Sequence, residues 1–176
     1  MVTSVIGKPY PPCIARFHDL EKIMIRDMLL ETNHRGAYLL LRSLCEANRM
    51  TAVMNIVEDE AGTASLVSLY MQEPENIRSA KDILKKGRSF IIKEPYFKMS
   101  TSGQYMIRVD HPTDIIWLPE DDVRVPKEWR CPFLGVRPAG PTTPIGNLSL
   151  TMGAAMLKDF GNQFYGQGKF VEAVDL

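Results

Sequence analysis

The chain has 176 residues, of which 45% are hydrophobic and 9% aromatic, a composition that supplies a folded core and excludes a disordered polypeptide. Its 21 Lys and Arg balance 21 Asp and Glu, so it lacks the basic excess typical of proteins that bind nucleic acid or anionic membranes. Three scattered cysteines (Cys13, Cys45, Cys131), no secretory signal and no bilayer-length apolar run predict an intracellular protein, cytoplasmic or nuclear, without metal, cofactor or membrane partner.

The first 36 residues are predicted to form a loose Pro-rich segment followed by a helix at about 15–32. Apolar side chains recur there at a helical spacing of three to four residues, at Phe17, Leu20, Met24 and Met28. Gly36 stands where a C-cap is wanted, so the helix is expected to end just before it.

The next eighty residues change to a strand-like pattern. Apolar and β-branched runs predict strands at 37–45, 51–58, 64–72, 89–98 and 104–110, and 115–118 continues or closes the last strand. In the third run, Val67, Leu69 and Met71 are expected on one face. A helix at about 75–86, stopped by Gly87, is expected between the third and fourth strands.

This order resembles the OB-fold superfamily over residues 37–118. The resemblance rests on the strand order, on the turn from Asp59 to Gly62, and on the run from Leu84 through Gly87 into Phe90. It implies a five-stranded OB-like β-barrel whose end is plugged by the helix. The expected fold class is therefore α+β, with this barrel between an N-terminal helix and a C-terminal helical segment.

The last third of the chain has a different composition. Six of the twelve prolines fall within residues 119–150, which predicts an extended linker. Residues 154–176 resemble the start of a tetratricopeptide repeat, with packing positions at Leu157, Gly161, Phe164, Gly168, Phe170 and Ala173. One incomplete repeat cannot bury its own apolar face, which favours a fragment of a longer protein or docking of the last helix. Four segments are predicted: 1–36, the barrel 37–118, the linker 119–150 and the repeat 151–176.

The overall order also resembles the N-terminal part of fungal tetratricopeptide proteins that continue into a SET-type lysine methyltransferase domain. Three short sequence stretches carry this resemblance: Thr32-Asn33-His34-Arg35-Gly36, Ile56-Val57-Glu58-Asp59-Glu60 and Arg108-Val109-Asp110-His111. It implies that the catalytic domain is absent from this chain, because no residues match a methyl-donor site or a zinc cluster.

An OB-like barrel suggests a face for single-stranded nucleic acid, on which aromatic rings stack with bases and basic side chains follow the phosphates. The candidate residues are Arg42, Tyr70, Lys93, Tyr96 and Arg108. However, residues 37–118 contain ten Lys or Arg and ten Asp or Glu, which weakens this interpretation. His111 lies near Asp110 and Asp114 in sequence, but a single histidine among acidic residues favours a structural role over a catalytic site.

Two classes of function and a third alternative follow. The first is a non-catalytic module for protein interaction or scaffolding, with an unidentified protein partner, at the start of a longer tetratricopeptide protein. The second is a module that binds single-stranded nucleic acid. The third is the regulatory part of a SET-type lysine methyltransferase. The charge balance favours the first, so the chain is predicted not to be an enzyme itself, although a longer parent protein could be one.

Overall fold

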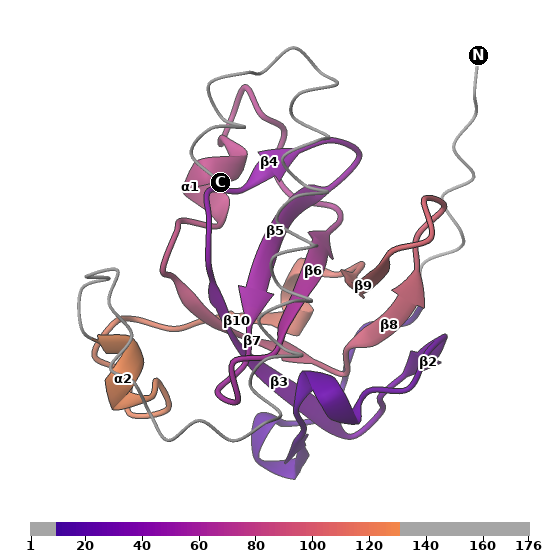
Figure 1. The fold of residues 1–176 in the computed structure, drawn as a ribbon, viewed down its shortest axis with the longest axis vertical. Coiled ribbons are helices and arrows are strands. Elements are labelled where there is room, and N and C mark those ends of the chain that lie inside the picture. Colours follow the sequence, from indigo (N-terminus) through magenta and orange to yellow (C-terminus); the bar gives the residue numbers. More distant parts are fainter. Residues whose placement is uncertain (1–9, 131–176) are drawn as a thin grey trace, which may run out of the picture.

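The computed structural model describes residues 10–130 of the chain, and Figure 1 shows them as a coiled β-sheet with short helical turns at its margins. Ten strands form one mixed sheet, accompanied by two four-residue α-helices, α1 (Ala80–Ile83) and α2 (Lys127–Arg130). Three 3-10 turns, η1 (Phe17–Asp19), η2 (Ile25–Asp27) and η3 (Pro112–Asp114), complete the described elements.

The strands differ widely in length. In chain order they are β1 (Glu21–Lys22), β2 (Thr32–Asn33), β3 (Ala37–Ser43), β4 (Asn48–Arg49), β5 (Val53–Glu58), β6 (Ala64–Leu69), β7 (Ser89–Lys93), β8 (Tyr96–Met99), β9 (Tyr105–Val109) and β10 (Ile115–Trp117). Neighbouring strands follow the order β10-β7-β3-β5-β6-β9-β8-β2, while β1 pairs with β3 and β4 pairs with β5. The β6–β9 and β1–β3 pairs are parallel, and the other pairs are antiparallel.

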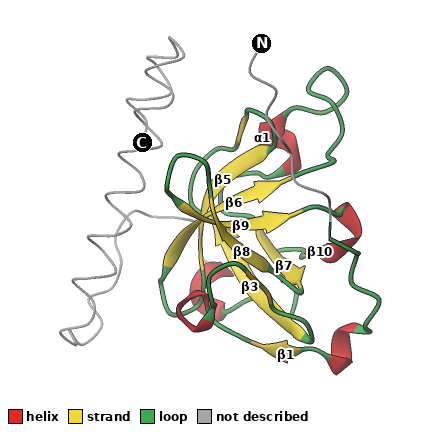
Figure 2. Cartoon of the chain, turned by 90° about the vertical axis from the view of Figure 1, so that its right-hand side faces the viewer, coloured by secondary structure: helices red, strands yellow, loops and turns green. Residues whose placement is uncertain are grey.

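The sheet coils because β7 and β8 are nearly continuous but pair with different neighbours. Only Glu94 and Pro95 separate them, yet β7 pairs with β3 whereas β8 pairs with β9. Glu94 has a positive φ of 48°, and the proline has no N–H to donate to a ladder. The bend therefore carries the chain from one part of the sheet to another, as the turned view in Figure 2 shows.

The core lies inside the coil. Fully buried side chains from β3, β6, β7 and β9 form its centre, including Leu39, Val67, Phe90, Ile92 and Ile107. A smaller apolar cluster on the outer side joins Leu40, Ile91, Leu118 and Val125. Because both faces of β3 and β7 are covered, these strands are continuous apolar runs in the sequence instead of alternating patterns.

Strands occur within each of the predicted ranges between residues 37 and 118, with shorter bounds than expected. The single strand predicted at 89–98 is divided into β7 and β8, and β10 pairs with β7 and does not continue β9. The predicted fold class is wrong, however: the described chain is mostly β, with ten strands in one mixed sheet and two short α-helices, and not a five-stranded barrel between helical segments. Strands of two residues have no detectable alternation, which is why β1, β2 and β4 were missed. The predicted C-terminal helical segment lies outside the described residues.

The helix expected at 15–32 is also wrong. Residues 16–28 contain two short 3-10 turns with strand β1 between them, and Leu20, Met24 and Met28 beside the turns have extended backbone angles. The apolar spacing instead buries one side chain at a time, at Leu20, Ile25 and Met28. A residue outside this segment stabilises its non-helical backbone, because the N–H of Ile25 donates to Asp59 Oδ2 at 2.8 Å. Gly36, with φ of 75°, forms the turn from β2 into β3 and not a helix C-cap.

Two local predictions fail between β6 and β7. The helix expected at 75–86 shrinks to α1, whose N-terminus is capped by the Ser79 side chain accepting from the N–H of Asp82. Met71 does not share a buried face with Val67 and Leu69, because the strand ends at Leu69 and Met71 has a positive φ of 52°. The Met71 side chain is accordingly 69% exposed.

Candidate functional site

Three of the five residues predicted for a binding face meet beside β9. The guanidinium carbon of Arg108 lies 4.9 Å from the centre of the Tyr70 ring, a distance at which cation and ring attract each other. Tyr96 on β8 is the cross-strand partner of Arg108 on β9. We call Tyr70, Tyr96 and Arg108 the Arg108 cluster.

The charge of this cluster is compensated inside the protein. Arg108 Nε donates to Asp110 Oδ1 at 2.6 Å, and the two side chains are only 7% and 3% exposed. Removing two ions from water is costly, so such a pair persists only where the partners satisfy each other. Within residues 10–130, the second carboxylate oxygen of Asp110 is buried without a hydrogen-bond partner, which makes this carboxylate dependent on Arg108.

Tyr96 has a polar partner at the edge of the sheet. Its hydroxyl donates to Glu31 Oε2 at 2.9 Å, while Glu31 Oε1 accepts from the backbone N–H of Met99 at 2.9 Å. These two hydrogen bonds lower the pKa of Glu31, whereas burial and the bond to Glu31 raise the pKa of Tyr96. Glu31 thus covers the margin of β8 just beyond its pairing with β2, where an open edge would invite pairing with another chain.

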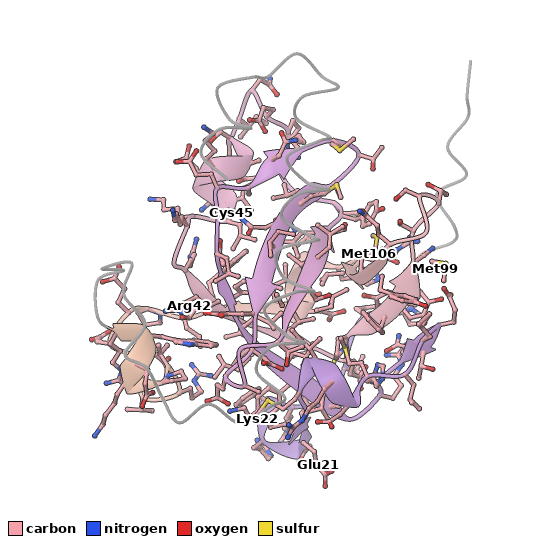
Figure 3. The ribbon with its side chains drawn as sticks, in the orientation of Figure 1. Glu21, Lys22, Arg42, Cys45, Met99 and Met106 are labelled. Atoms are coloured by element: carbon pink, nitrogen blue, oxygen red, sulfur yellow. The ribbon has the colours of Figure 1, made fainter. Side chains whose placement is uncertain are left out.

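Arg42 lies apart from this cluster. Its guanidinium forms an ion pair with the buried Glu58 and stacks at 5.1 Å on the ring of Trp129. Figure 3 shows Arg42 beside α2, with Met106 of β9 on the other side of the molecule. Lys93 is also separate: it lies on β7 opposite Tyr38, across the Glu94–Pro95 bend from Tyr96.

The predicted nucleic-acid face is therefore not assembled as one surface. Both arginines of the set are engaged by buried carboxylates, and phosphate contacts require cationic donors that can turn outward. The assignment of Arg42, Tyr70, Lys93, Tyr96 and Arg108 to a binding face stays a prediction. The six predicted tetratricopeptide packing positions, from Leu157 to Ala173, lie outside the described residues.

Sequence reasoning missed the residue that completes the Arg108 cluster, Tyr10. Its hydroxyl donates to the carbonyl oxygen of Arg108 at 3.0 Å and accepts from the N–H of Asp110 at 3.2 Å. Its ring lies edge-on to Tyr96, with centroids 5.7 Å apart. Nearly one hundred residues separate Tyr10 from β9, so no local pattern could place it there; the aromatic ring within a Pro-rich segment was the one available signal.

Asp114 is the second buried acid near this site. Its side chain is 1% exposed; Oδ1 accepts from the backbone N–H of Cys13 at 2.9 Å, and Oδ2 has no partner in the part of the chain that the structure describes. Burial raises the pKa of Asp114 above its ordinary value, against the smaller opposing effects of the Cys13 bond and the charge of Lys93. Burial therefore favours the neutral form of this acid more in the folded chain than in the unfolded one.

A pH-dependent stability difference is expected from Asp114. Because its folded pKa is raised, the stability it contributes is fully present below the unfolded value near 3.8 and is lost as pH rises through the folded pKa. Urea unfolding of wild type and Asp114→Asn, followed by tryptophan fluorescence from pH 4 to 8, should show wild type losing stability relative to the variant as pH rises. Burial tends to raise the pKa of Glu94, but hydrogen bonds from Gly36 and Arg35 lower it, and this residue is present in both proteins. A difference that does not change with pH would contradict this assignment.

Within residues 10–130, no group of three or more His, Cys, Asp or Glu side chains is arranged to hold a metal ion. Cys13 and Cys45 are buried free thiols, and burial raises the pKa of each. No helix in this part of the chain is long and apolar enough to span a membrane. Over these residues, the site offers hydrogen bonds, ring faces and paired charges as its chemistry.

No protein-family model matches the chain. It is 53% identical over 130 residues to a Gibberella zeae protein named a methyltransferase; the match covers 74% of this chain. The matched part spans 18% of the length of that relative. Among solved structures, the chain is similar to the OB domain of a Methanosarcina mazei protein, with 14% identity and a TM-score of 0.41, over 62% of this chain and 89% of the domain. A likeness at that level carries no argument about function.

The fungal relative corrects one prediction. The chain was predicted not to be an enzyme, and that prediction conflicts with a relative of this identity that is named a methyltransferase. The prediction rested on the residues of this chain alone, whereas the relative is several times longer than the part that matches. Residues that carry out methyl transfer in the relative can therefore lie outside the matched part.

Proposed function

We propose that this chain is part of a methyltransferase, and that its sheet domain is the part of that enzyme that binds protein. The observation that carries the proposal is the 53% identity over 130 residues to the Gibberella zeae methyltransferase. Identity at that level over most of a folded domain supports a shared fold and a shared role in the polypeptide. Because the match spans 18% of the relative, methyl transfer itself is assigned to the whole protein and not to the sheet alone.

The finer proposal is that a protein lysine is the methyl acceptor. It rests on the resemblance to SET-type proteins, which is carried by three short sequence stretches. In the first stretch, the N–H of Gly36 donates to Glu94 Oε1 at 3.0 Å. In the second, Asp59 accepts from Ile25, and in the third, His111 contacts the carbonyl of Tyr10 at 2.5 Å. All three stretches thus lie where residues 10–36 contact the sheet.

Protein is favoured over nucleic acid as the bound partner because several arginine side chains are held by carboxylates or aromatic rings of the same chain. Arg42 and Arg108 are paired with buried carboxylates, and Arg88 and Arg124 stack on the rings of Trp117 and Phe17 at 4.4 and 5.4 Å. Cations held in this way contribute little to a phosphate track, whereas nucleic-acid affinity is dominated by such contacts. The tetratricopeptide scaffold and the division into four segments remain predictions within this proposal.

The experiment is a domain exchange in the Gibberella zeae relative. The matching segment is replaced by residues 10–130 of this chain, and transfer of a labelled methyl group from the methyl donor is measured into protein, nucleic acid and small-molecule fractions of a fungal extract. We expect the exchanged enzyme to label protein at a rate within about threefold of the parent enzyme, and a deletion of the segment to lower protein labelling by tenfold or more. Label that enters nucleic acid instead would overturn the protein part of the proposal.

A further inference from the structure

The chain's own N-terminal segment, Tyr10-Pro11-Pro12-Cys13, is seated on the sheet as a peptide ligand would be. Both ends of this segment are held by groups about one hundred residues away. At one end the Tyr10 hydroxyl bonds to the backbone at Arg108 and Asp110. At the other end the Cys13 N–H donates to Asp114 Oδ1. We call the surface formed by Arg35, Tyr96, Asp110, His111 and Asp114 the latch site.

Tyr10 occupies a position that the sheet leaves open. Tyr96 is opposite Arg108, but the next residue back, Pro95, has no N–H, and the N–H of Glu94 donates to Ala37 instead. The backbone of β9 therefore loses its β8 partner beyond Arg108. The Tyr10 hydroxyl donates to the carbonyl oxygen of Arg108 and accepts from the N–H of Asp110, so a single phenol binds the β9 backbone where its pairing with β8 ends.

The remaining contacts fix the direction of the segment. The carbonyl oxygen of Tyr10 faces His111 Nε2 at 2.5 Å, and Arg35 Nη2 donates to the Pro11 carbonyl at 3.3 Å. Arg35 is itself held by Glu94 at 2.5 Å. The Tyr10 ring meets Tyr96 and His111 edge-on, at 5.7 and 5.9 Å between centroids. Pro11 and Pro12 are exposed, so they serve as stiff spacers between the two anchored ends.

The latch site also has hydrogen-bonding capacity that the segment leaves unused. Asp110 and Asp114 are 2% and 1% exposed, and among residues 10–130 one side-chain oxygen of each has no hydrogen-bond partner. Polar atoms left unpaired in so buried a position are unusual, because an unpaired buried polar group costs free energy. These two side chains give the latch site a polar wall.

We propose that the latch site is a recognition site for extended Tyr-Pro-Pro peptides, and that residues 10–13 occupy it in cis. The proposal rests on the protein-binding part of the proposed function and names its ligand class. A Tyr-Pro-Pro segment of a partner protein displaces residues 10–13 and makes the same contacts: phenol to β9, backbone carbonyls to His111 and Arg35, and a backbone N–H to Asp114. Because residues 10–13 compete in cis, the apparent affinity for an added peptide equals the intrinsic affinity multiplied by the fraction of molecules whose latch site is open.

The test uses the full chain and a fluorescent peptide with the sequence of residues 4–16, kept reduced, and measures anisotropy. Tyr10→Ala opens the latch; Ile14→Ala, at a side chain that is 96% exposed, is the matched control. We expect saturable binding to Tyr10→Ala at least tenfold tighter than to wild type or Ile14→Ala. A peptide with phenylalanine at the tyrosine position should bind about tenfold more weakly, because it cannot satisfy the two β9 groups.

A second variant protects the test against misfolding. Tyr10→Phe keeps the ring and removes only the hydroxyl, so it opens the latch with less disturbance of the fold. Both variants are checked first for a cooperative unfolding transition. Failure of both folded variants to bind the peptide, or equal binding of the tyrosine and phenylalanine peptides, would overturn the proposal. Because no methyl transfer is measured, such a failure is distinct from failure of the domain exchange.

Discussion

Replacing Asp59 by alanine is expected to lower the free energy of unfolding by about 3 kcal/mol, because three backbone N–H groups lose a charged acceptor. Asp59 is 1% exposed; Oδ2 accepts from Ile25 at 2.8 Å, and Oδ1 accepts from Ala61 and Thr63 at 3.0 Å each. One carboxylate thus shapes the β5–β6 turn and fastens the arm of residues 10–36 to it.

Urea unfolding followed by the fluorescence of Trp117 and Trp129 measures this effect. Asp59→Asn should cost less, about 1–2 kcal/mol, because its single oxygen can still serve the two N–H groups of the turn while that of Ile25 is lost. Asp121→Ala, at an exposed acid, is the matched control and should stay within about 0.5 kcal/mol of wild type. A loss below about 1 kcal/mol for Asp59→Ala would mean that the arm is held by its apolar contacts alone.

The Arg108→Met variant is expected to lose about 3–5 kcal/mol, since it leaves the carboxylate of Asp110 buried without its cation. The loss should be partly reversed by adding Asp110→Asn, which removes the uncompensated charge. The reversal is the decisive readout, because a simple packing defect at Arg108 would not respond to a neutral side chain at Asp110. Arg26→Met, at a side chain that is 70% exposed, should change stability by less than about 0.5 kcal/mol.

The strands of the central sheet could be predicted from the sequence because their apolar runs are long and bounded by turn residues. Leu39 to Leu41 and Phe90 to Ile92 are buried on both faces, and such runs are visible without knowledge of the partners. The N-terminal arm could not be predicted. Its apolar spacing mimics a helix, whereas its true hydrogen-bond partners, Asp59 and Glu94, lie far away in the sequence.

The site was predictable only in part, for the same reason. Tyr70, Tyr96 and Arg108 were found as aromatic and basic residues of three predicted strands, and the fold brings them together. The carboxylate that neutralises Arg108 follows two residues later and was visible, but nothing local showed that both side chains are buried. Tyr10, which closes the site, is placed by tertiary contacts alone.

We propose that this chain is part of a methyltransferase and supplies its protein-binding domain, by its 53% identity to the Gibberella zeae relative. The most direct measurement is the initial rate of labelled methyl transfer into protein by the Gibberella zeae relative in three forms: intact, with residues 10–130 of this chain in place of its own matching segment, and with that segment deleted. We expect similar rates for the first two forms and at least a tenfold lower rate for the third. Equal rates in all three forms would contradict it, because the domain would then have no part in binding the methylated protein.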